Sequence, residues 1–475
     1  MSRIVVIGAG VGGLTAAALL AAAGHRVVLH ERSATVGGKL ASYERDGFVF
    51  DTGPSLLTLP QVFDGLPEGL VPLDPVVRHV FPDGAVLDSS SSVDVFQRRI
   101  TSALGSESAA DWARFFRRAE RIWDASWRSV LRHPVTPASL AGLAWRVGDL
   151  AAIAPGRTLR GLGRRYLRDH RLRMMLDRYA TYTGADPRRA PAALAAIPYA
   201  ELAFGGWYLP GGLGGLATAL HRRCAALGVR IELSSEVSRI CTSGDQVSGV
   251  LADGSFVPAD VVVSDVDALT LYRDLLPTPA RLGALADRSL AGFVLLLGVR
   301  GETPSLAHHT VFFPRDYNAE FGAVFGSPGR RAAPATDPTI FITRATDPAV
   351  HPPGDEAWFV LVNAPRHGTA WSAVDWRRPG LAESYATHIL TVLAARGLDV
   401  RNRLRFVETR TPADLADATA APGGAIYGTA GGLLRPPNRG PVDGLWLVGG
   451  SAHPGGGLPM VTLSAQIVAD QIGPA

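Results

Sequence analysis

The pattern of apolar residues at the start of the chain predicts a β-α-β unit. Residues 3–7 are almost entirely apolar, as in a strand that is buried on both faces. A glycine-rich turn follows, and the alanine- and leucine-rich stretch over 12–23 predicts a helix. A second apolar run over 26–31 predicts another strand. The chain therefore opens like an α/β domain with a parallel sheet.

Helical periodicity dominates the next long segment. Residues 76–100 favour short strands with a turn at 82–84. From 106 to 182 we predict mostly helix. Between Trp112 and Val130, aromatic and aliphatic residues recur every three or four positions, and arginines occupy the opposite side. This pattern is typical of helices with one apolar and one cationic face.

The rest of the chain alternates strands with a few helices. The predicted strands lie over 229–233, 236–241, 247–252, 260–264, 290–300, 309–314, 356–362 and 444–448. The predicted helices lie over 214–227, 381–396 and 459–472. We assign the strands between 290 and 362 to a second sheet. A chain of 475 residues exceeds one ordinary core, so two or three packed units are expected.

Composition and charge exclude several classes of function. The formal net charge is only +4, which argues against general nucleic-acid binding. The two cysteines, Cys224 and Cys241, cannot form a disulfide framework, and no metal-ligand spacing is present, so we expect no metal. We expect a cytoplasmic protein, because the chain enters a strand at once and has no apolar stretch long enough to span a bilayer.

The motif Gly8-x-Gly10-x-x-Gly13 lies between the first strand and the first helix. Gly8 allows a tight turn, Gly10 lets a diphosphate approach the backbone, and Gly13 lets the helix pack closely on the strand. The helix N-terminus adds N–H donors for the phosphates. Glu31 ends the second strand, where its carboxylate can accept hydrogen bonds from a ribose. These features predict a dinucleotide site; the alternative is a tight turn without a ligand.

The residues after Glu31 favour a flavin nucleotide over a nicotinamide one. The segment that starts at Arg32 carries Gly37, Gly38 and Lys39, so that backbone N–H groups and a cation can face phosphate. The alternative for Lys39 is a solvated loop charge. No second dinucleotide motif is present, so we predict one tightly held cofactor and no separate NAD(P)H domain. Electrons are then expected to leave to a small acceptor such as oxygen or a quinone.

Several further motifs, in order along nearly the whole chain, carry a resemblance to one family. They are Gly37-Gly38-Lys39, Gly47-Phe48-x-Phe50-Asp51-x-Gly53-Pro54-Ser55, Pro210-Gly211-Gly212, Ser264-Asp265 with Tyr272-Arg273-Asp274-Leu275-Leu276, Leu306-Ala307-His308-His309-Thr310-Val311, Arg435-Pro436-x-Asn438-Arg439 and His453-Pro454-Gly455-x-Gly457. On these motifs the chain resembles the bacterial carotenoid desaturases of the phytoene-desaturase type. Within that family, Pro459-Met460 is most similar to the carotenoid 3,4-desaturases.

The resemblance implies FAD in a Rossmann-type domain of the glutathione-reductase kind. It places the flavin ring beside the turn at 53–55 and the main chain of Val237 against adenine. The cofactor-binding residues that it implies are Gly8, Gly10, Gly13, Glu31, Arg32, Gly38, Lys39, Gly53, Pro54, Ser55, Val237, Gly449, Gly450 and Met460. In flavoproteins at large an acidic residue usually follows the last strand; here Gly450-Ser451 stands in its place, which leaves the ribityl hydroxyls without an assigned partner.

The resemblance and the predicted elements together give the fold class. We predict an α/β protein with a Rossmann-type FAD-binding domain, an inserted mixed-sheet substrate domain and a helical, membrane-facing region. The FAD-binding domain comprises 1–75, 205–268 and 425–475, and the substrate domain comprises 76–204 and 269–424.

The resemblance also implies a reaction. Hydride leaves an allylic carbon of an acyclic carotenoid for the flavin and a proton leaves its neighbour, which creates a new C=C bond. Candidate catalytic residues are Asp169 and Arg173, four positions apart on one helix face, and His453. The alternative interpretation of the first pair is a salt bridge on a solvated helix, and that of His453 is a structural turn.

The substrate points to a membrane. Transfer of a long polyene from water costs on the order of tens of kcal/mol, at about 0.8 kcal/mol per buried CH₂ group, so it should arrive from a bilayer. From Trp112 to Arg178 the chain has 15 arginines against 5 acidic residues. We therefore expect the helical region over 106–182 to bind the inner face of the cell membrane peripherally. The alternative is a helical cap on the protein's own core.

The sequence thus predicts an FAD-dependent carotenoid desaturase, with 3,4-desaturation of a (1-hydroxy)carotenoid as the specific reaction. The alternatives are a phytoene or neurosporene desaturase that forms lycopene, a carotenoid ketolase, and an amine-oxidase-like flavoenzyme. A carrier of FAD or of carotenoid fits the same sequence.

Overall fold

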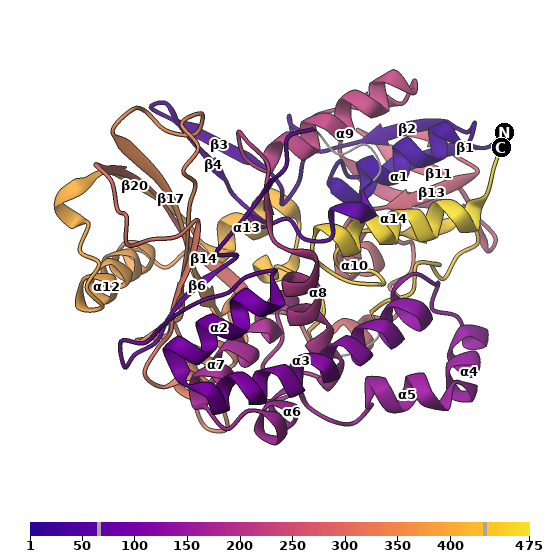
Figure 1. Cartoon of the computed structure of the whole chain (residues 1–475). Coiled ribbons are helices and arrows are strands. Elements are labelled where there is room, and N and C mark those ends of the chain that lie inside the picture. Colours follow the sequence, from indigo (N-terminus) through magenta and orange to yellow (C-terminus); the bar gives the residue numbers. More distant parts are fainter. Residues whose placement is uncertain (64–67, 431–434) are drawn as a thin grey trace.

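The computed structural model describes residues 1–63, 68–430 and 435–475, and a five-stranded parallel sheet lies at one end of it (Figure 1). Its strands, in the order β21-β13-β1-β2-β9, are β21 (Leu445–Leu447), β13 (Val261–Ser264), β1 (Arg3–Ile7), β2 (Arg26–His30) and β9 (Arg230–Glu232). The sheet is therefore assembled from strands at the beginning, middle and end of the chain.

Both faces of this sheet are covered, which explains why its strands are apolar at successive positions. Ile4 and Val6 of β1 pack into a core with α1 (Val11–Ala22), α9 (Gly214–Ala226) and α14 (Leu458–Ile472). Val5 and Ile7 enter a second core with a three-stranded antiparallel sheet on the other face. The strands of that sheet are β10 (Val237–Ser243), β11 (Gln246–Ala252) and β12 (Ser255–Pro258). Alternate side chains of one strand thus serve two cores.

The two chain ends lie side by side (Figure 1). The backbone N–H of Ala475 donates to the carbonyl oxygen of Ala23 at 3.0 Å, and the His25 ring hydrogen-bonds the Gly473 carbonyl at 2.9 Å. Strands β1 and β21 both pair with β13. The turns that follow these two strands therefore leave the same edge of the sheet.

A second, seven-stranded sheet lies at the other end of the molecule. Its strands, in order, are β20 (Leu404–Arg410), β14 (Ala291–Arg300), β17 (Asp355–Ala364), β16 (Ile340–Arg344), β15 (His309–Phe312), β6 (Arg78–Val80) and β7 (Val86–Asp88). Only the β15–β6 pair is parallel, so the sheet is mixed. Helix α12 (Leu381–Ala395) packs on one face and shares a core with β14 and β17.

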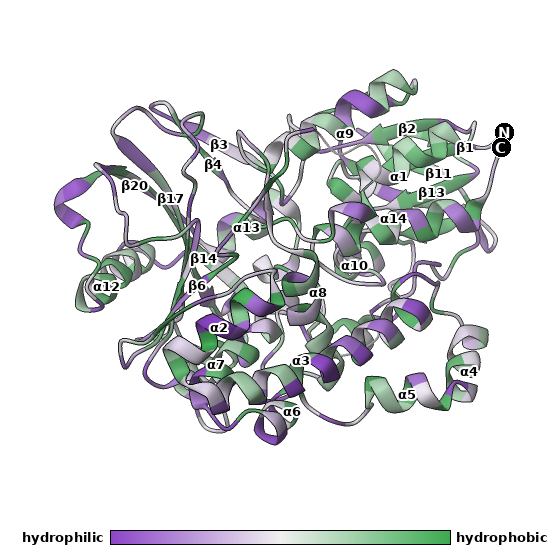
Figure 2. Cartoon of the chain, viewed as in Figure 1, coloured by the Kyte–Doolittle hydropathy of each residue, from purple (hydrophilic) through white to green (hydrophobic). Residues whose placement is uncertain are grey.

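The chain from residue 93 to residue 204 is mostly helical. Its helices are α2 (Val93–Leu104), α3 (Ser106–Ser126), the π-helix η2 (Trp127–Leu131), α4 (Pro137–Trp145), α5 (Val147–Ile153), α6 (Leu159–Tyr166), α7 (His170–Arg178), the 3₁₀ turns η3 (Tyr179–Thr183) and η4 (Ala192–Ala195), and α8 (Ala196–Phe204). Most carry apolar and polar bands (Figure 2). Their apolar faces form one core with Phe313 and Phe321 from the sheet side and Leu463 of α14.

Short elements complete the described chain. They are the hairpin β3 (Ser42–Arg45) with β4 (Phe48–Asp51), the pair β5 (Val71–Pro72) with β8 (Trp207–Tyr208), the pair β18 (Arg366–His367) with β19 (Ala373–Val374), α10 (Ala268–Thr270), α11 (Tyr317–Phe325), α13 (Pro412–Thr419), and the one-turn elements η1 (Pro60–Val62), η5 (Leu271–Leu275), η6 (Leu282–Leu285), η7 (Arg401–Arg403) and η8 (Pro422–Gly424). Among residues 1–63, 68–430 and 435–475, no helix has the length and hydropathy that a bilayer-spanning segment needs.

One predicted segment differs from the structure. Strands were predicted over 76–100, and β6 and β7 confirm its first part, but the prediction is wrong from Val93 onward, where α2 begins. Ser92 caps this helix by accepting a hydrogen bond from the Val95 N–H, and Phe96 and Ile100 are buried four residues apart. Capping and a period of four favour a helix over a short strand.

Candidate functional site

The first glycine turn, after β1, requires glycine at two positions. Gly8 adopts a φ of +97°, which L side chains rarely take. A Cβ on Gly13 would lie 2.0 Å from the Gly8 carbonyl oxygen, so only glycine lets α1 approach the strand this closely. The turn therefore presents bare backbone and the N-terminus of α1 at the carboxyl edge of the sheet, which is where nucleotides bind in such folds.

The second glycine turn, after β21, touches the first. Gly449 has a φ of +90°, and a Cβ on Gly12 would lie 3.0 Å from the Gly449 Cα atom. Gly450 follows and is partly exposed. The structure thus brings together two turns that are more than four hundred residues apart in the sequence.

Glu31 closes one side of the first turn. Its carboxylate accepts hydrogen bonds from the Ala9 N–H at 2.7 Å and from the Ser33 N–H at 2.8 Å. The Glu31 carbonyl oxygen accepts from the Ser235 N–H at 2.8 Å, and this contact places the start of β10, Val237, beside the end of β2. The segment that leads into Val237 is therefore attached to the end of β2 next to Glu31.

Lys39 and the 53–55 turn pack directly on this site. A Cβ on Gly38 would lie 3.3 Å from the Gly10 Cα atom, and one on Gly53 would lie 1.8 Å from the Lys39 carbonyl oxygen. The Lys39 ammonium donates to the carbonyl oxygens of Ala425 and Ile426 at 3.2 and 2.7 Å. Its burial lowers its pKa. Lys39 is thus not the solvated loop charge that the sequence left open.

The remaining predicted cofactor residues differ in their surroundings. Ser55, which follows Pro54, is buried, and its hydroxyl shares a hydrogen bond of 2.8 Å with that of Thr343. Met460 on α14 packs against the core of the helical region. Arg32, by contrast, is exposed, and its guanidinium donates to the Asp417 carbonyl oxygen in α13. Among the described residues, no hydrogen bond or ion pair joins the Arg32 side chain to either glycine turn.

Asp265 is the site residue that sequence reasoning missed. It follows β13, and its carboxylate receives a hydrogen bond from the Gly13 N–H. A Cβ on Gly10 would lie 2.3 Å from one carboxylate oxygen of Asp265, and a Cβ on Gly449 would lie 2.0 Å from the other. Burial, aided by the charge of Glu31, raises the pKa of this carboxyl to about 7, although the Gly13 N–H and Lys39 act to lower it. The available signal was the position of Asp265 directly after a buried strand.

The predicted acid–arginine pair is not joined in the structure. Asp169 caps α7, and its carboxylate binds the backbone N–H and the guanidinium of Arg171, with a shortest ion-pair distance of 2.7 Å. It also accepts a hydrogen bond from Ser108 at 3.3 Å. Asp169 therefore pairs with Arg171 and not with Arg173, which corrects the salt bridge considered for this helix. Helix α7 also lies well away from β1 and α1 (Figure 1).

His453 is buried and holds two main-chain groups. Its Nε2 lies 3.1 Å from the Val130 carbonyl oxygen and 2.9 Å from that of His133, so Nε2 carries a proton and donates to both. Burial lowers the pKa of the ring, which keeps it neutral. This geometry ties the second glycine loop to the end of η2, as the structural interpretation of this residue required.

We expect His453→Ala to lower the free energy of unfolding by about 1–3 kcal/mol, because two carbonyl groups lose their buried donor. Urea unfolding measures this loss. If His453 instead acts as a general base, the variant keeps its stability, and the pH dependence of turnover changes.

The residues at the carboxyl edge fit an FAD nucleotide. The first turn consists of glycine backbone at the N-terminus of α1, Glu31 can accept hydrogen bonds from a ribose, and Lys39 adds a cation. Within the part of the chain that the structure describes, no group of three or more histidine, cysteine or acidic side chains could hold a metal ion.

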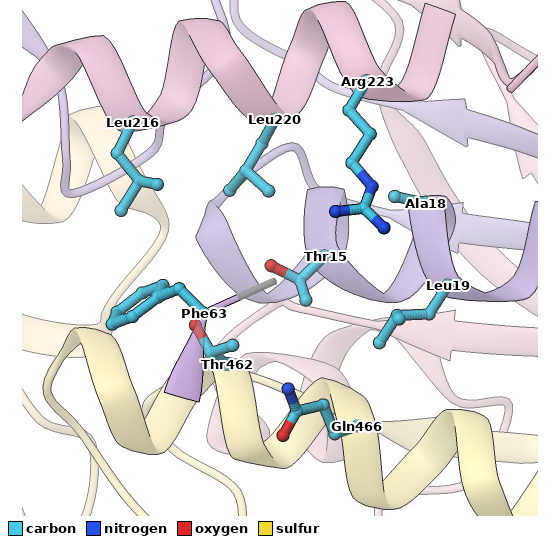
Figure 3. Close-up of a pocket in the computed structure, with 9 residues that line it drawn as sticks. All are labelled: Thr15, Ala18, Leu19, Phe63, Leu216, Leu220, Arg223, Thr462 and Gln466. Carbon is cyan, nitrogen blue, oxygen red and sulfur yellow. The ribbon is translucent and has the colours of Figure 1, made fainter. Parts of the chain in front are cut away.

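Two small cavities lie outside the carboxyl edge. One of about 20 Å³ lies between α1, α9 and α14, where Thr15 faces Leu220 and Arg223 (Figure 3). Another of about 40 Å³ lies beside the 53–55 turn and is lined by Ser55, Thr343 and Tyr208. Such volumes hold water molecules rather than a cofactor ring.

Comparison with known proteins agrees with this geometry. A sequence profile of the flavin-containing amine oxidoreductase family matches residues 11–293. The chain is 34% identical to a 4,4'-diapolycopene oxygenase from Methylomonas sp, over 99% of this chain and 98% of the relative. It is 33% identical to a hydroxyneurosporene desaturase from Cereibacter sphaeroides, over 99% of this chain and 97% of the relative.

The fold is also similar to solved structures. A crystal structure of an oxidoreductase from Methanosarcina mazei superposes with a TM-score of 0.65 and 18% identity, over 98% of this chain and 100% of that one. At this identity the likeness concerns the fold alone, which is an α/β fold with mixed sheets.

Proposed function

Because this chain belongs to the flavin-containing amine oxidoreductase family, and is an FAD-dependent oxidoreductase, we propose that it desaturates acyclic carotenoids. The observation that supports this most is the full-length similarity to two carotenoid-modifying enzymes, combined with the convergence of both glycine turns on one edge of the parallel sheet. The specific reaction that we propose is 3,4-desaturation of a (1-hydroxy)carotenoid, on the strength of Pro459-Met460.

In this proposal the protein positions the polyene and excludes water. When bound, FAD supplies a hydride acceptor. Desaturation would then transfer a hydride from an allylic carbon to this acceptor and a proton from the neighbouring carbon to solvent, and oxygen or a quinone would take up the two electrons. No polar group of the substrate needs to be activated, so the main role of the protein is to position the polyene against the flavin.

Aromatic side chains are buried beside α14. Met460 of α14 packs against a core that contains Phe313, Tyr317 and Phe321 on the sheet side and Tyr179 on the helical side. Tyr427 packs against the second glycine loop, where a Cβ on Gly456 would lie 2.3 Å from its ring. We propose that the polyene binds next to this aromatic core.

The proposal is tested by expressing the gene in cells that make different acyclic carotenoids and separating their pigments by chromatography. We expect a product with a longer conjugated chain and the same number of oxygen atoms. Unchanged pigments with all of these substrates would contradict a desaturase.

Oxygenation is the second candidate, because the Methylomonas relative is named an oxygenase. Both reactions can begin by oxidation of the same allylic carbon, but only oxygenation adds an atom from O₂. Growth under ¹⁸O₂ and mass analysis of the pigment separates the two. A labelled carbonyl or hydroxyl group would favour the oxygenase.

The detailed domain assignment also belongs to the proposal. The strand order β21-β13-β1-β2-β9, backed by the antiparallel sheet β10–β12, supports a nucleotide-binding domain of the glutathione-reductase kind. The boundaries predicted from the sequence stay a prediction.

We further propose that α4 and α5 rest on the membrane. Trp145 is 87% exposed and Val147 is 70% exposed, although α4 is mostly apolar (Figure 2). Arg146 lies between them and is exposed, and Arg128 nearby has a largely exposed side chain that pairs with Asp149. Apolar tips flanked by arginines are typical of helices that lie in an anionic membrane interface.

We expect the double variant Trp145→Asp, Val147→Asp to bind anionic lipid vesicles at least about tenfold more weakly, because a buried Trp or Val contributes about 1.5–3 kcal/mol and 1.4 kcal/mol is tenfold. Co-sedimentation measures binding. Trp371→Asp is the control, since this tryptophan is 56% exposed but lies outside the helical region. Equal binding of all three proteins would contradict the proposed contact.

A further inference from the structure

Three cations converge on the segment 425–429, beside the second glycine turn. Lys39 donates to the carbonyl oxygens of residues 425 and 426. Arg435 donates to the Tyr427 carbonyl oxygen at 2.7 Å and to the Thr429 hydroxyl at 3.2 Å. Arg288 forms a β-bridge with Thr429. We call Lys39, Arg288 and Arg435 the cation cluster.

Arg288 is the member of the cation cluster whose bonding is incomplete. It is only 3% exposed, and its Nη2 donates to the Asp267 carboxylate at 2.7 Å. Its Nε and Nη1 are buried and have no hydrogen-bond partner among the described residues. Buried guanidinium donors are normally satisfied, so an acceptor is expected at these two nitrogens.

The charge of the cluster points to the kind of acceptor. Lys39 and Arg435 bind neutral carbonyl and hydroxyl oxygens, so their charges are not matched by a direct ion pair. Asp267 compensates Arg288, and Asp265 is the other carboxyl that acts on Lys39. Positive charge is therefore in excess, and buried charges are stable when they are paired. We therefore expect the acceptor at Arg288 to be a negatively charged or strongly polar oxygen.

The position of Arg288 connects it to the cofactor site. Its partner Asp267 lies two residues after Asp265, at the carboxyl end of β13. The Ala268 N–H donates to the Ser451 hydroxyl at 2.9 Å, and a Cβ on Gly428 would lie 2.7 Å from the Ser451 Cβ atom. Arg288 thus lies behind the Gly450-Ser451 turn, at the position where the sequence lacks the usual acidic residue.

We propose that Arg288 is a cofactor-contacting residue whose Nε–H and Nη1–H groups donate to an oxygen of bound FAD. Two parts of FAD carry an oxygen that could accept these hydrogen bonds: the diphosphate, and the carbonyl at the pyrimidine end of the flavin ring. The inference rests on FAD as the cofactor and does not depend on the carotenoid substrate.

The variants are chosen to separate contact from folding. Arg288→Met removes the donors and leaves Asp267 unpaired, so the double variant Asp267→Asn, Arg288→Met removes the buried pair as a whole. The matched control is the double variant Asp177→Asn, Arg160→Met, because Arg160 and Asp177 form a 2.7 Å ion pair with 16% and 11% exposed side chains in α6 and α7. Circular dichroism identifies any variant that has not folded.

Two binding titrations and one redox measurement test whether Arg288 contacts FAD. Apoprotein is titrated with FAD and with ADP, followed by fluorescence, and the midpoint potential of bound FAD is measured against reference dyes. We expect the double variant at Asp267 and Arg288 to bind FAD at least tenfold more weakly, and the control double variant at Asp177 and Arg160 to stay within twofold of the parent. Weaker ADP binding places the contact at the diphosphate; unchanged ADP binding with a lower potential places it at the flavin ring. Any other pattern, above all FAD binding within threefold of the parent, overturns the proposal.

Discussion

The variant Gly13→Ala is expected to lose FAD almost completely, with at least a hundredfold weaker binding. The new Cβ would lie 2.0 Å from the Gly8 carbonyl oxygen, so α1 must move away from β1. That movement displaces the helix N-terminus and the turn, which we propose face the diphosphate. A hundredfold change corresponds to about 2.7 kcal/mol of binding free energy. Titration of the apoprotein with FAD measures the loss.

A glycine in open space provides the control. Gly142 lies in α4, and a Cβ added there would meet no atom within 4 Å, so Gly142→Ala should leave FAD binding unchanged and add slightly to helix stability. Tight FAD binding by folded Gly13→Ala would show that the first glycine turn does not hold the cofactor.

The variant Asp265→Asn is expected to stabilise the cofactor-free protein at pH 8 and to leave it unchanged near pH 3.5. The folded pKa of Asp265 is about 7 against an ordinary value of 3.8, so the folded state binds this proton more tightly than the unfolded state. The contribution of Asp265 is therefore lost as pH rises from about 4 to 7. A pKa shift from 3.8 to about 7 changes the free energy of unfolding by about 4 kcal/mol at most.

Urea unfolding of both proteins across this pH range measures the effect. Glu320, whose pKa is also raised to about 7 by burial, is present in both, so the difference between them isolates Asp265. The charged groups that face Asp265 are Glu31 and Lys39, and both residues are present in the parent and in the variant. A stability difference that does not vary with pH would mean that Asp265 has an ordinary pKa.

The nucleotide-binding elements could be predicted because their signals are local. A buried strand, a glycine turn and a helix follow one another over residues 3–23, and each needs only neighbouring residues to form. The end of the chain carries the same kind of signal around Gly449. The resemblance to carotenoid desaturases then related the two turns to one cofactor, and the sheet order places them in contact.

The rest of the site depends on packing between distant segments. Asp265 matters because its carboxylate reaches Gly10 and Gly449, and nothing in its own neighbourhood in the sequence reports these contacts. Asp169 was expected to face Arg173 from helical spacing, but as the N-cap residue it lies outside the regular helix and reaches Arg171 instead. The unpartnered nitrogens of Arg288 become visible only once every described neighbour is in place.

Oxidation of a carotenoid by the bound flavin can be observed directly, by adding an acyclic carotenoid in liposomes to the FAD-loaded protein without oxygen and recording the visible spectrum. We predict that the flavin absorption falls while the carotenoid absorption moves to longer wavelength, in equal molar amounts. The flavin absorption should return when oxygen or a quinone is admitted. A flavin spectrum that stays unchanged with every acyclic carotenoid supplied would contradict carotenoid desaturation by this protein.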